Sequence, residues 1–265
     1  MRKLYLLIPA TCFCFFLNAQ FKLGTNYALS IPQGEMGNNI NPVHTLNVSF
    51  LYTPKIFCQR FSVGTEMGFG NYAYVTKEQD LRFPDGSGIK TDVIYTSNVA
   101  KAALVLRGNL AAKGKVIPYL EAKAGTASFF SNVYVEDPED ESSCKPLESK
   151  NIINDNTFYT GYGGGVQLDG TVFDKKATPG KFMIDIGINK VQGGSLNYIN
   201  TKNIQTHIHT DPNAPPEPGK GEALNVQFIN IATQTIHEHQ VAELFNSKLR
   251  MIDIRIGVLF KLGKN

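Results

Sequence analysis

The closing stretch of the chain, residues 249–262, constrains the fold more than any other part of the sequence. From Ile252 onward every even position is apolar, whereas the odd positions hold Asp, Arg, Gly, Leu and Lys. Because successive side chains of a strand point to opposite faces, such a strand has one apolar face and one charged face. Charges are costly to bury unpaired in a soluble core. The pattern therefore favours a strand whose apolar face meets lipid and whose polar face lines a barrel.

The first nineteen residues have the three regions of a secretory signal peptide. Arg2 and Lys3 precede an apolar run over residues 4–17, and Asn18 and Ala19 follow it. The run is shorter than the apolar stretch that a transmembrane helix needs to span the membrane. We therefore expect residues 1–19 to be removed, which leaves a β-barrel domain over residues 20–265.

The charges of the chain are almost balanced. The whole sequence has 26 Lys and Arg against 23 Asp and Glu, and loss of Arg2 and Lys3 with the signal peptide leaves 24 against 23. This balance excludes bulk electrostatic attraction to nucleic acid, so we expect no nucleic-acid partner. The mature part keeps two cysteines, Cys58 and Cys144, which are too few for a disulfide scaffold.

Seven further segments alternate apolar and polar residues as the closing stretch does. Together they predict eight strands, at residues 21–31, 45–53, 60–70, 94–110, 116–134, 158–172, 182–189 and 249–262. Long connections are predicted after every odd-numbered strand, at residues 33–42, 77–88, 136–156 and 201–247. The connections after even-numbered strands are short. Outer-membrane barrels sort their connections in this way, with short periplasmic turns and long extracellular loops.

The predicted fold class is therefore all-β, an eight-stranded antiparallel transmembrane β-barrel in the outer membrane of a Gram-negative bacterium. Phe and Tyr at the tips of the apolar rows are typical of the aromatic girdles of such barrels. A barrel with ten strands is the alternative if residues 203–209 and 224–236 enter the membrane. Their polar residues favour an extension above it.

The polar rows of the predicted strands carry five positive and five negative side chains. They are Lys22, Lys101, Arg107, Lys123 and Arg255 against Glu66, Glu121, Asp169, Asp185 and Asp253. An eight-stranded barrel is just wide enough for side chains to fill it, and each ion would be costly there without a partner. We therefore predict a paired lumen ion network that plugs the barrel, in place of an open pore.

Three stretches resemble strands of the small bacterial outer-membrane β-barrel proteins of the OmpX and OmpA-barrel type. They are residues 118–125 (PYLEAKAG), the glycine run 161–165 (GYGGG) and the closing strand. The resemblance covers essentially the mature chain and implies the same barrel fold. Members of these families range from adhesion and anchoring proteins to occasional lipid-modifying enzymes, so no single function is implied. Such families usually end on an aromatic residue, whereas five residues follow Phe260 here.

The longest loop contains two pairs of histidines, His207 with His209 and His237 with His239. Residues i and i+2 of an extended segment share a face, so each pair presents two imidazoles together. Continued pairing of the flanking strands would bring the two pairs close to each other. This spacing motivates the hypothesis of a four-histidine site for zinc, copper or nickel. Solvated loop histidines without a metal are the alternative.

No catalytic or nucleotide-binding motif is evident. The glycine run 161–165 is followed by neither Lys-Ser/Thr nor a helical pattern, so we expect no nucleotide site and no cofactor. No Ser sits in a local hydrolase motif, so we expect no enzyme. The predicted function is a structural or surface-interaction role, with outer-membrane lipid around the barrel and a protein or glycan partner at the extracellular loops. The alternative is a metal-capturing receptor or a barrel enzyme that uses the loop histidines.

Overall fold

The structure is a computed structural model that describes residues 19–54, 60–82, 88–112, 114–135, 148–176, 178–202, 221–229 and 236–262. Strands make up most of these residues. In chain order the strands are β1 (Ala19–Pro32), β2 (Val43–Pro54), β3 (Phe61–Arg82), β4 (Gly88–Asn109), β5 (Val116–Val135), β6 (Glu148–Asp169), β7 (Phe182–Ile199), β8 (Glu222–Ile229) and β9 (Ile236–Leu262). A short helix α2 (Glu35–Asn39) joins β1 to β2, and a 3-10 turn η2 (Gly170–Val172) follows β6. Residues 1–18 of the predicted signal peptide lie outside the described residues, and its last residue, Ala19, is the first residue of β1.

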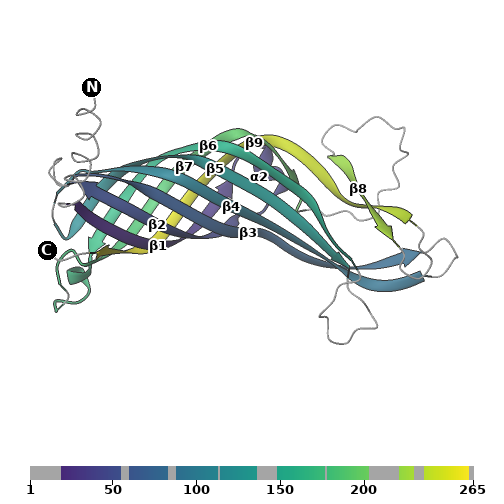
Figure 1. Cartoon of the computed structure of the whole chain (residues 1–265), viewed down its shortest axis with the longest axis horizontal. Coiled ribbons are helices and arrows are strands. Elements are labelled where there is room, and N and C mark those ends of the chain that lie inside the picture. The colour runs from purple at the N-terminus through teal and green to yellow at the C-terminus, as the bar shows by residue number, and fades with distance from the viewer. Residues whose placement is uncertain are drawn as a thin grey trace, which may run out of the picture.

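Eight of the strands form one closed antiparallel barrel (Figure 1). Each strand from β1 to β7 pairs with the next, β9 pairs with β7, and β1 pairs with β9 to close the ring. β8 pairs with β9 outside this ring, beyond the barrel end that lies opposite the start of β1. The predicted eight-stranded barrel is confirmed. The ten-stranded alternative is wrong, because β8 and its partner segment of β9 form an extension above the closed ring.

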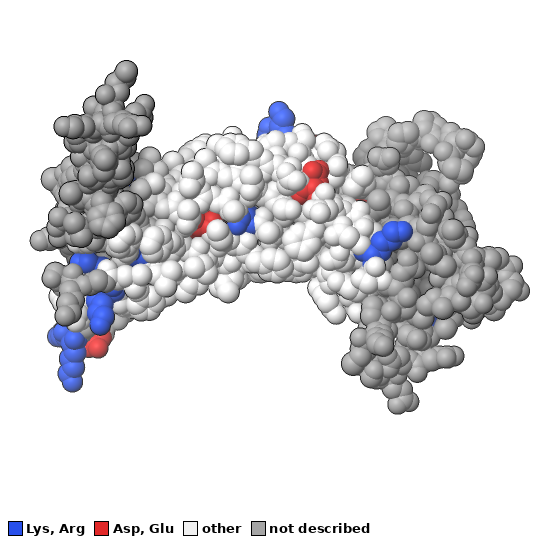
Figure 2. Space-filling view, in the orientation of Figure 1, with Lys and Arg blue, Asp and Glu red and all other residues white. Residues whose placement is uncertain are grey.

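The predicted orientation of the strands is also confirmed. The apolar rows point outward, and Leu46, Met67 and Leu104 are each more than 60% exposed, at 63%, 66% and 65%. The alternate residues point inward and are buried, including polar ones such as Lys22 and Asn26. Figure 2 shows the result as a largely uncharged surface between the two ends of the molecule. None of the helices among the described residues is long and apolar enough to cross a membrane.

The strands are longer than the sequence pattern predicts. β3, β4 and β6 have 22 residues each and β5 has 20, whereas a membrane-spanning strand needs about 10. Most of the predicted connection at residues 77–88 is in fact paired strand, because β3 and β4 stay in register from Thr76 with Ile94 to Arg82 with Gly88. The part of the predicted connection 136–156 that begins at Glu148 is likewise strand. These paired strand ends, with β8 and the start of β9, are here called the extension.

The interior of the barrel is layered along its axis. On β7 the inward residues change from Met183 to Asp185 and then to Val191, so an ionic layer lies between two apolar ones. The inward residues of β9 follow the same order, from Leu259 through Arg255 to Met251. A further apolar cluster fills the extension and consists of Val93, Tyr95, Val133, Ile153, Ile199 and Ala242. The extension therefore has a core of its own.

Candidate functional site

The ionic layer is centred on Glu121 of β5, whose side chain is fully buried. Arg255 of β9 donates from Nη2 to one of its oxygens at 2.7 Å, and Nη1 lies 2.7 Å from the other oxygen as an ion pair. Arg107 of β4 donates to the same carboxylate from Nε at 2.8 Å and from Nη2 at 2.7 Å. Asn189 adds an amide hydrogen bond at 3.3 Å. Charge-assisted bonds to a planar guanidinium are the strongest and most directional that side chains offer, so this carboxylate is held in one position.

The remaining members balance the charge around this centre. Asp185 accepts from Arg107 at 3.1 Å, and Lys123 donates to Glu66, which also lies 3.5 Å from Arg255. Three cations therefore face three anions within one connected layer. Lys101 and Asp253 form a separate pair at 3.5 Å on the outer side of it, with side chains 8% and 14% exposed. Eight of the ten residues predicted for the lumen network thus make ion pairs.

Lys22 and Asp169 do not join this network. Lys22 is buried in the lumen, 6% exposed, and makes no ion pair with any of the described residues. Asp169 instead closes the turn between β6 and β7, where its carboxylate accepts hydrogen bonds from the backbone and hydroxyl of Thr171 and from the backbone of Gly180. Burial opposes the charge of Asp169, but these three hydrogen bonds outweigh it and lower its pKa. Because Asp169 is at the end of its strand, its carboxylate binds the nearby backbone N–H groups of the turn and not the lumen cations.

Tyr119 packs against the two arginines of the ionic layer. The guanidinium of Arg107 lies 4.2 Å from the centre of its ring, and Arg255 donates to its hydroxyl at 3.0 Å. The hydroxyl occupies space that two glycines leave open, since a Cβ on Gly165 or Gly187 would lie 2.4 Å or 2.6 Å from it. Gly165 of the glycine run 161–165 thus leaves room for a bulky lumen side chain.

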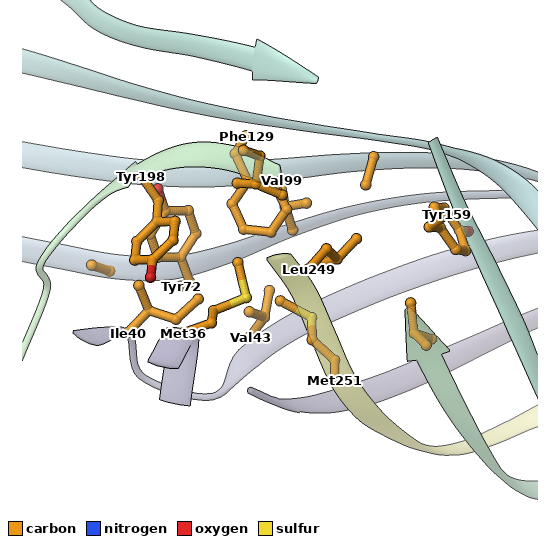
Figure 3. Packing of buried hydrophobic residues seen from close by; sticks show 14 of the residues in the cluster. Met36, Ile40, Val43, Tyr72, Val99, Phe129, Tyr159, Tyr198, Leu249 and Met251 are labelled. Atoms are coloured by element: carbon orange, nitrogen blue, oxygen red, sulfur yellow. The ribbon is translucent and has the colours of Figure 1, made fainter. Parts of the chain in front are cut away.

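A second buried layer lies at the outer end of the barrel, where α2 folds inward (Figure 3). Met36 and Ile40 are 0% and 1% exposed and belong to an apolar cluster that includes Tyr72, Phe129 and Tyr198. Figure 3 shows the side chains of α2 pointing toward these aromatic rings. The composition of residues 33–42 predicts only a polar connection. The one signal for burial was the spacing of Met36 and Ile40, which puts two apolar residues on one side of a helical turn.

The segment after β7 holds α2 in place. The backbone N–H of Thr201 donates to the carbonyl of Asn39 at 2.9 Å, and the amide of Asn39 donates to the Tyr198 hydroxyl at 3.3 Å. Lys202 donates from its ammonium group to the carbonyl of Gly37. The carbonyl groups of Gly37 and Asn39 in this short helix therefore accept hydrogen bonds from the residues that follow β7.

The loop histidines are only partly placed. His237 and His239 lie in the extension on β9, in register with Phe228 and Val226 of β8. His207 and His209 lie outside the described residues. Among the residues whose side chains are described, no group of three or more His, Cys, Asp or Glu is arranged to hold a metal ion. The four-histidine site stays a prediction.

Comparisons with known proteins give only distant structural likenesses. No protein-family profile and no curated protein matches the sequence. Neisserial surface protein A matches at 11% identity and a TM-score of 0.37, over 92% of this chain and 97% of that one. The Yersinia pestis attachment invasion locus protein Ail matches at 10% identity and a TM-score of 0.34, over 92% and 97%. A major outer membrane protein from Thermus thermophilus matches at 10% identity and a TM-score of 0.39, over 92% and 99%.

These likenesses are too weak to carry a function to this chain. The fold rests on the strand pairing itself, which closes eight antiparallel strands into one ring. The chain is a closed, eight-stranded antiparallel β-barrel.

Proposed function

We propose that this protein is a non-enzymatic barrel of the outer membrane of a Gram-negative bacterium, closed to solutes, whose extension presents a surface to a protein or glycan partner. The observation that carries the proposal is the extension itself. Its strands continue in register beyond the length that a membrane requires, and they enclose a separate apolar cluster. A disordered loop needs neither feature.

Closure of the lumen is supported by two independent layers. The ion layer around Glu121 joins β3, β4, β5, β7 and β9 across the interior. Above it, Met36 of α2 and Ile40, the residue after the helix, pack into the outer end of the barrel. An eight-stranded barrel leaves little room beside inward side chains even without such layers. Permeation would require both to move.

A stiff extension also suits recognition. Binding to a partner costs less when the contacting segments are already ordered, because less conformational entropy is lost. The paired strands β3 with β4 and β8 with β9 are ordered in this sense. Thr76 and Glu78 of β3, both exposed, add hydrogen-bonding groups to such a surface.

Closure is tested by single-channel recording of the purified protein in planar bilayers. We expect no stable conductance of porin size from the intact chain. A variant with Arg107→Ala, Glu121→Ala and Arg255→Ala removes the centre of the ion layer and keeps α2, so it tests whether the outer layer alone keeps the barrel closed. Stable porin-size conductance of the intact chain would contradict the closed barrel.

The partner role is tested by trimming the extension. Residues 78–92 are replaced by Asn-Gly, a two-residue turn that fits a hairpin and leaves Lys77 and Val93 as paired neighbours. Both proteins, in nanodiscs, are then applied to a glycan array and to a panel of purified surface proteins. We expect binding by the intact protein and its loss in the trimmed variant while the barrel stays folded. Equal binding by both would rule out the β3–β4 part of the extension.

A further inference from the structure

The outward faces of β7 and β9 change abruptly from apolar to basic at one level of the barrel. Counting from the end where β7 begins, its outward residues are Phe182, three isoleucines and then Lys190, the first charge on that row. Counting from the same end, the outward row of β9 is apolar from Leu262 to Ile252, and Arg250 is its first charge. Lys248 follows on the same row.

The three basic side chains are neighbours in the sheet. Arg250 is paired with Gln192, two residues along β7 from Lys190, and Lys248 is paired with Ser195. Residues diagonal to each other on paired strands lie within about 8 Å, so long basic side chains on one face reach a common ligand. All three are exposed, and none makes an ion pair with a described residue.

Acidic residues are few around this cluster: Asp155 lies at the split between β6 and β7, where it accepts from the Asn197 backbone at 2.8 Å, and Glu35 of α2 is exposed. The outward rows of β6 over residues 154–168, of β7 over 182–192 and of β9 over 246–262 contain no Asp or Glu. The face is therefore a local excess of positive charge on a chain whose overall charges nearly cancel. Such an excess attracts anions, and its effect is strongest where water is partly excluded.

A hollow lies beside this basic cluster. β6 and β7 are paired only as far as Tyr159 with Gly193, although both strands continue beyond that point. β7 has a bulge between Gln192 and Ser195 at the split. The hollow is lined by Phe158, Tyr159, Thr160, Gln192, Gly193 and Gly194. Phe158, Gly193 and Gly194 of this hollow therefore lie next to Gln192, which is paired with Arg250.

We propose that Lys190, Lys248 and Arg250 bind the phosphate groups of an anionic lipid in the leaflet around the outer part of the barrel. The apolar outward rows of β7 and β9 lead directly to the basic residues, which favours a lipid over a water-soluble ligand. A molecule that packs its hydrocarbon against Ile188 and Ile254 brings its headgroup to the level where the basic residues begin. A water-soluble anion has no reason to bind at the border of an apolar row.

The site goes beyond the partner surface proposed above, because it lies on the barrel wall and not on the extension. It rests on the proposed membrane placement. Its failure is distinguishable from failure of the partner role, since the variant with residues 78–92 trimmed keeps all three basic residues.

Native mass spectrometry of the full chain released from detergent micelles tests the site. The probes are a diphosphorylated lipid A and the same lipid without its phosphates, added at equal concentrations. The test variant is Lys190→Gln, Lys248→Gln and Arg250→Gln together. The control variant is Lys175→Gln, Lys176→Gln and Lys181→Gln, which removes three exposed positive charges at the opposite end of the barrel.

We expect the test variant to bind the phosphorylated lipid on the order of a hundredfold more weakly, about fivefold for each charge removed. The control variant should bind it as the unmodified chain does, and the lipid without phosphates should not distinguish the proteins. Equal loss in both variants, or equal binding of both lipids, would overturn the proposal. The three residues are exposed, so folding should persist, and the single variant Arg250→Gln provides the same comparison if the triple variant does not fold.

Discussion

Arg255 binds Glu121 across the lumen with two N–O distances of 2.7 Å. The two residues come from β9 and β5, which are not neighbours in the barrel. Their ion pair therefore joins two parts of the wall that β6 and β7 separate, and it does not repeat a contact that backbone pairing already provides. Because Arg107 binds the same carboxylate, Glu121 is the point at which three parts of the wall meet.

The variant Glu121→Gln should be strongly destabilised. It keeps the size of the side chain but removes the negative charge that compensates two buried guanidinium groups. Loss of one partner of a buried ion pair costs about 3–5 kcal/mol, mainly because the other partner stays buried. The measurement is the free energy of unfolding in urea, with the protein in lipid vesicles.

Asp253→Asn is the matched control for this change. Asp253 also faces a lumen cation, but its pair with Lys101 is longer, at 3.5 Å, and more exposed than the Glu121 pairs. A smaller loss is expected because Asp253 makes one longer ion-pair contact with one cation, whereas Glu121 compensates two guanidinium groups. Equal losses of unfolding free energy in the two variants would mean that the central position of Glu121 adds nothing to its contribution to stability.

Two alanine substitutions in one glycine run should differ sharply. A Cβ on Gly165 would lie 2.1 Å from the Ile186 carbonyl oxygen, whereas a Cβ on Gly161 has no neighbour closer than 3.6 Å. Both glycines are on the inward row of β6. Gly165→Ala should therefore cost about 1–3 kcal/mol through forced shifts of β7, while Gly161→Ala should be nearly neutral. Urea unfolding of the two variants side by side checks this, and similar values would refute the close-approach explanation.

The sequence predicted the barrel wall well because one physical rule applies along most of it. Where lipid surrounds a strand, the outward residues must be apolar, and period-two alternation then identifies both the strand and its orientation. Charged inward residues such as Glu121 and Arg255 stand out against such a pattern. Their involvement in lumen ion pairs could be anticipated, whereas their exact partners depend on the barrel geometry.

The part of the extension that β3, β4, β5 and β6 form was missed because the same rule reverses there. Above the membrane, water surrounds the strands, so the inward residues Val93 and Tyr95 are apolar and the outward ones are polar. Side chains still alternate between the two faces, but the apolar ones now point inward. A strand defined by an apolar outward row therefore ends at this point. α2 was missed for a related reason. Its burial depends on contacts with distant residues such as Tyr198, which local composition does not reveal.

Removal of the Met36 side chain should loosen the buried layer at the outer end of the barrel. Met36 is fully buried beside Tyr72, so Met36→Ala leaves a cavity and should cost about 2–5 kcal/mol if α2 cannot collapse into it. Glu35→Ala is a suitable control, because Glu35 is exposed in the same helix. The measurement is hydrogen exchange of residues 35–40, which should become faster in the Met36 variant alone. Unchanged exchange would show that α2 is held by its hydrogen bonds and not by this packing.

Asp169 should make the stability of the barrel depend on pH. Its hydrogen bonds from Thr171 and Gly180 lower its pKa in the folded state below the unfolded value of about 3.9. The stabilisation is therefore complete above about pH 4 and is lost as the pH falls through the lower, folded pKa. Asp169→Asn should cost about 1–2 kcal/mol at pH 7, and the difference from the unmodified protein should shrink at acidic pH. Urea unfolding at pH 7 and below pH 3 measures this, with Asp174→Asn as the control because Asp174 is exposed in the same turn and accepts one hydrogen bond from Lys176. A cost for Asp169→Asn that does not change with pH would show that the ionised form of Asp169 has no advantage in this turn.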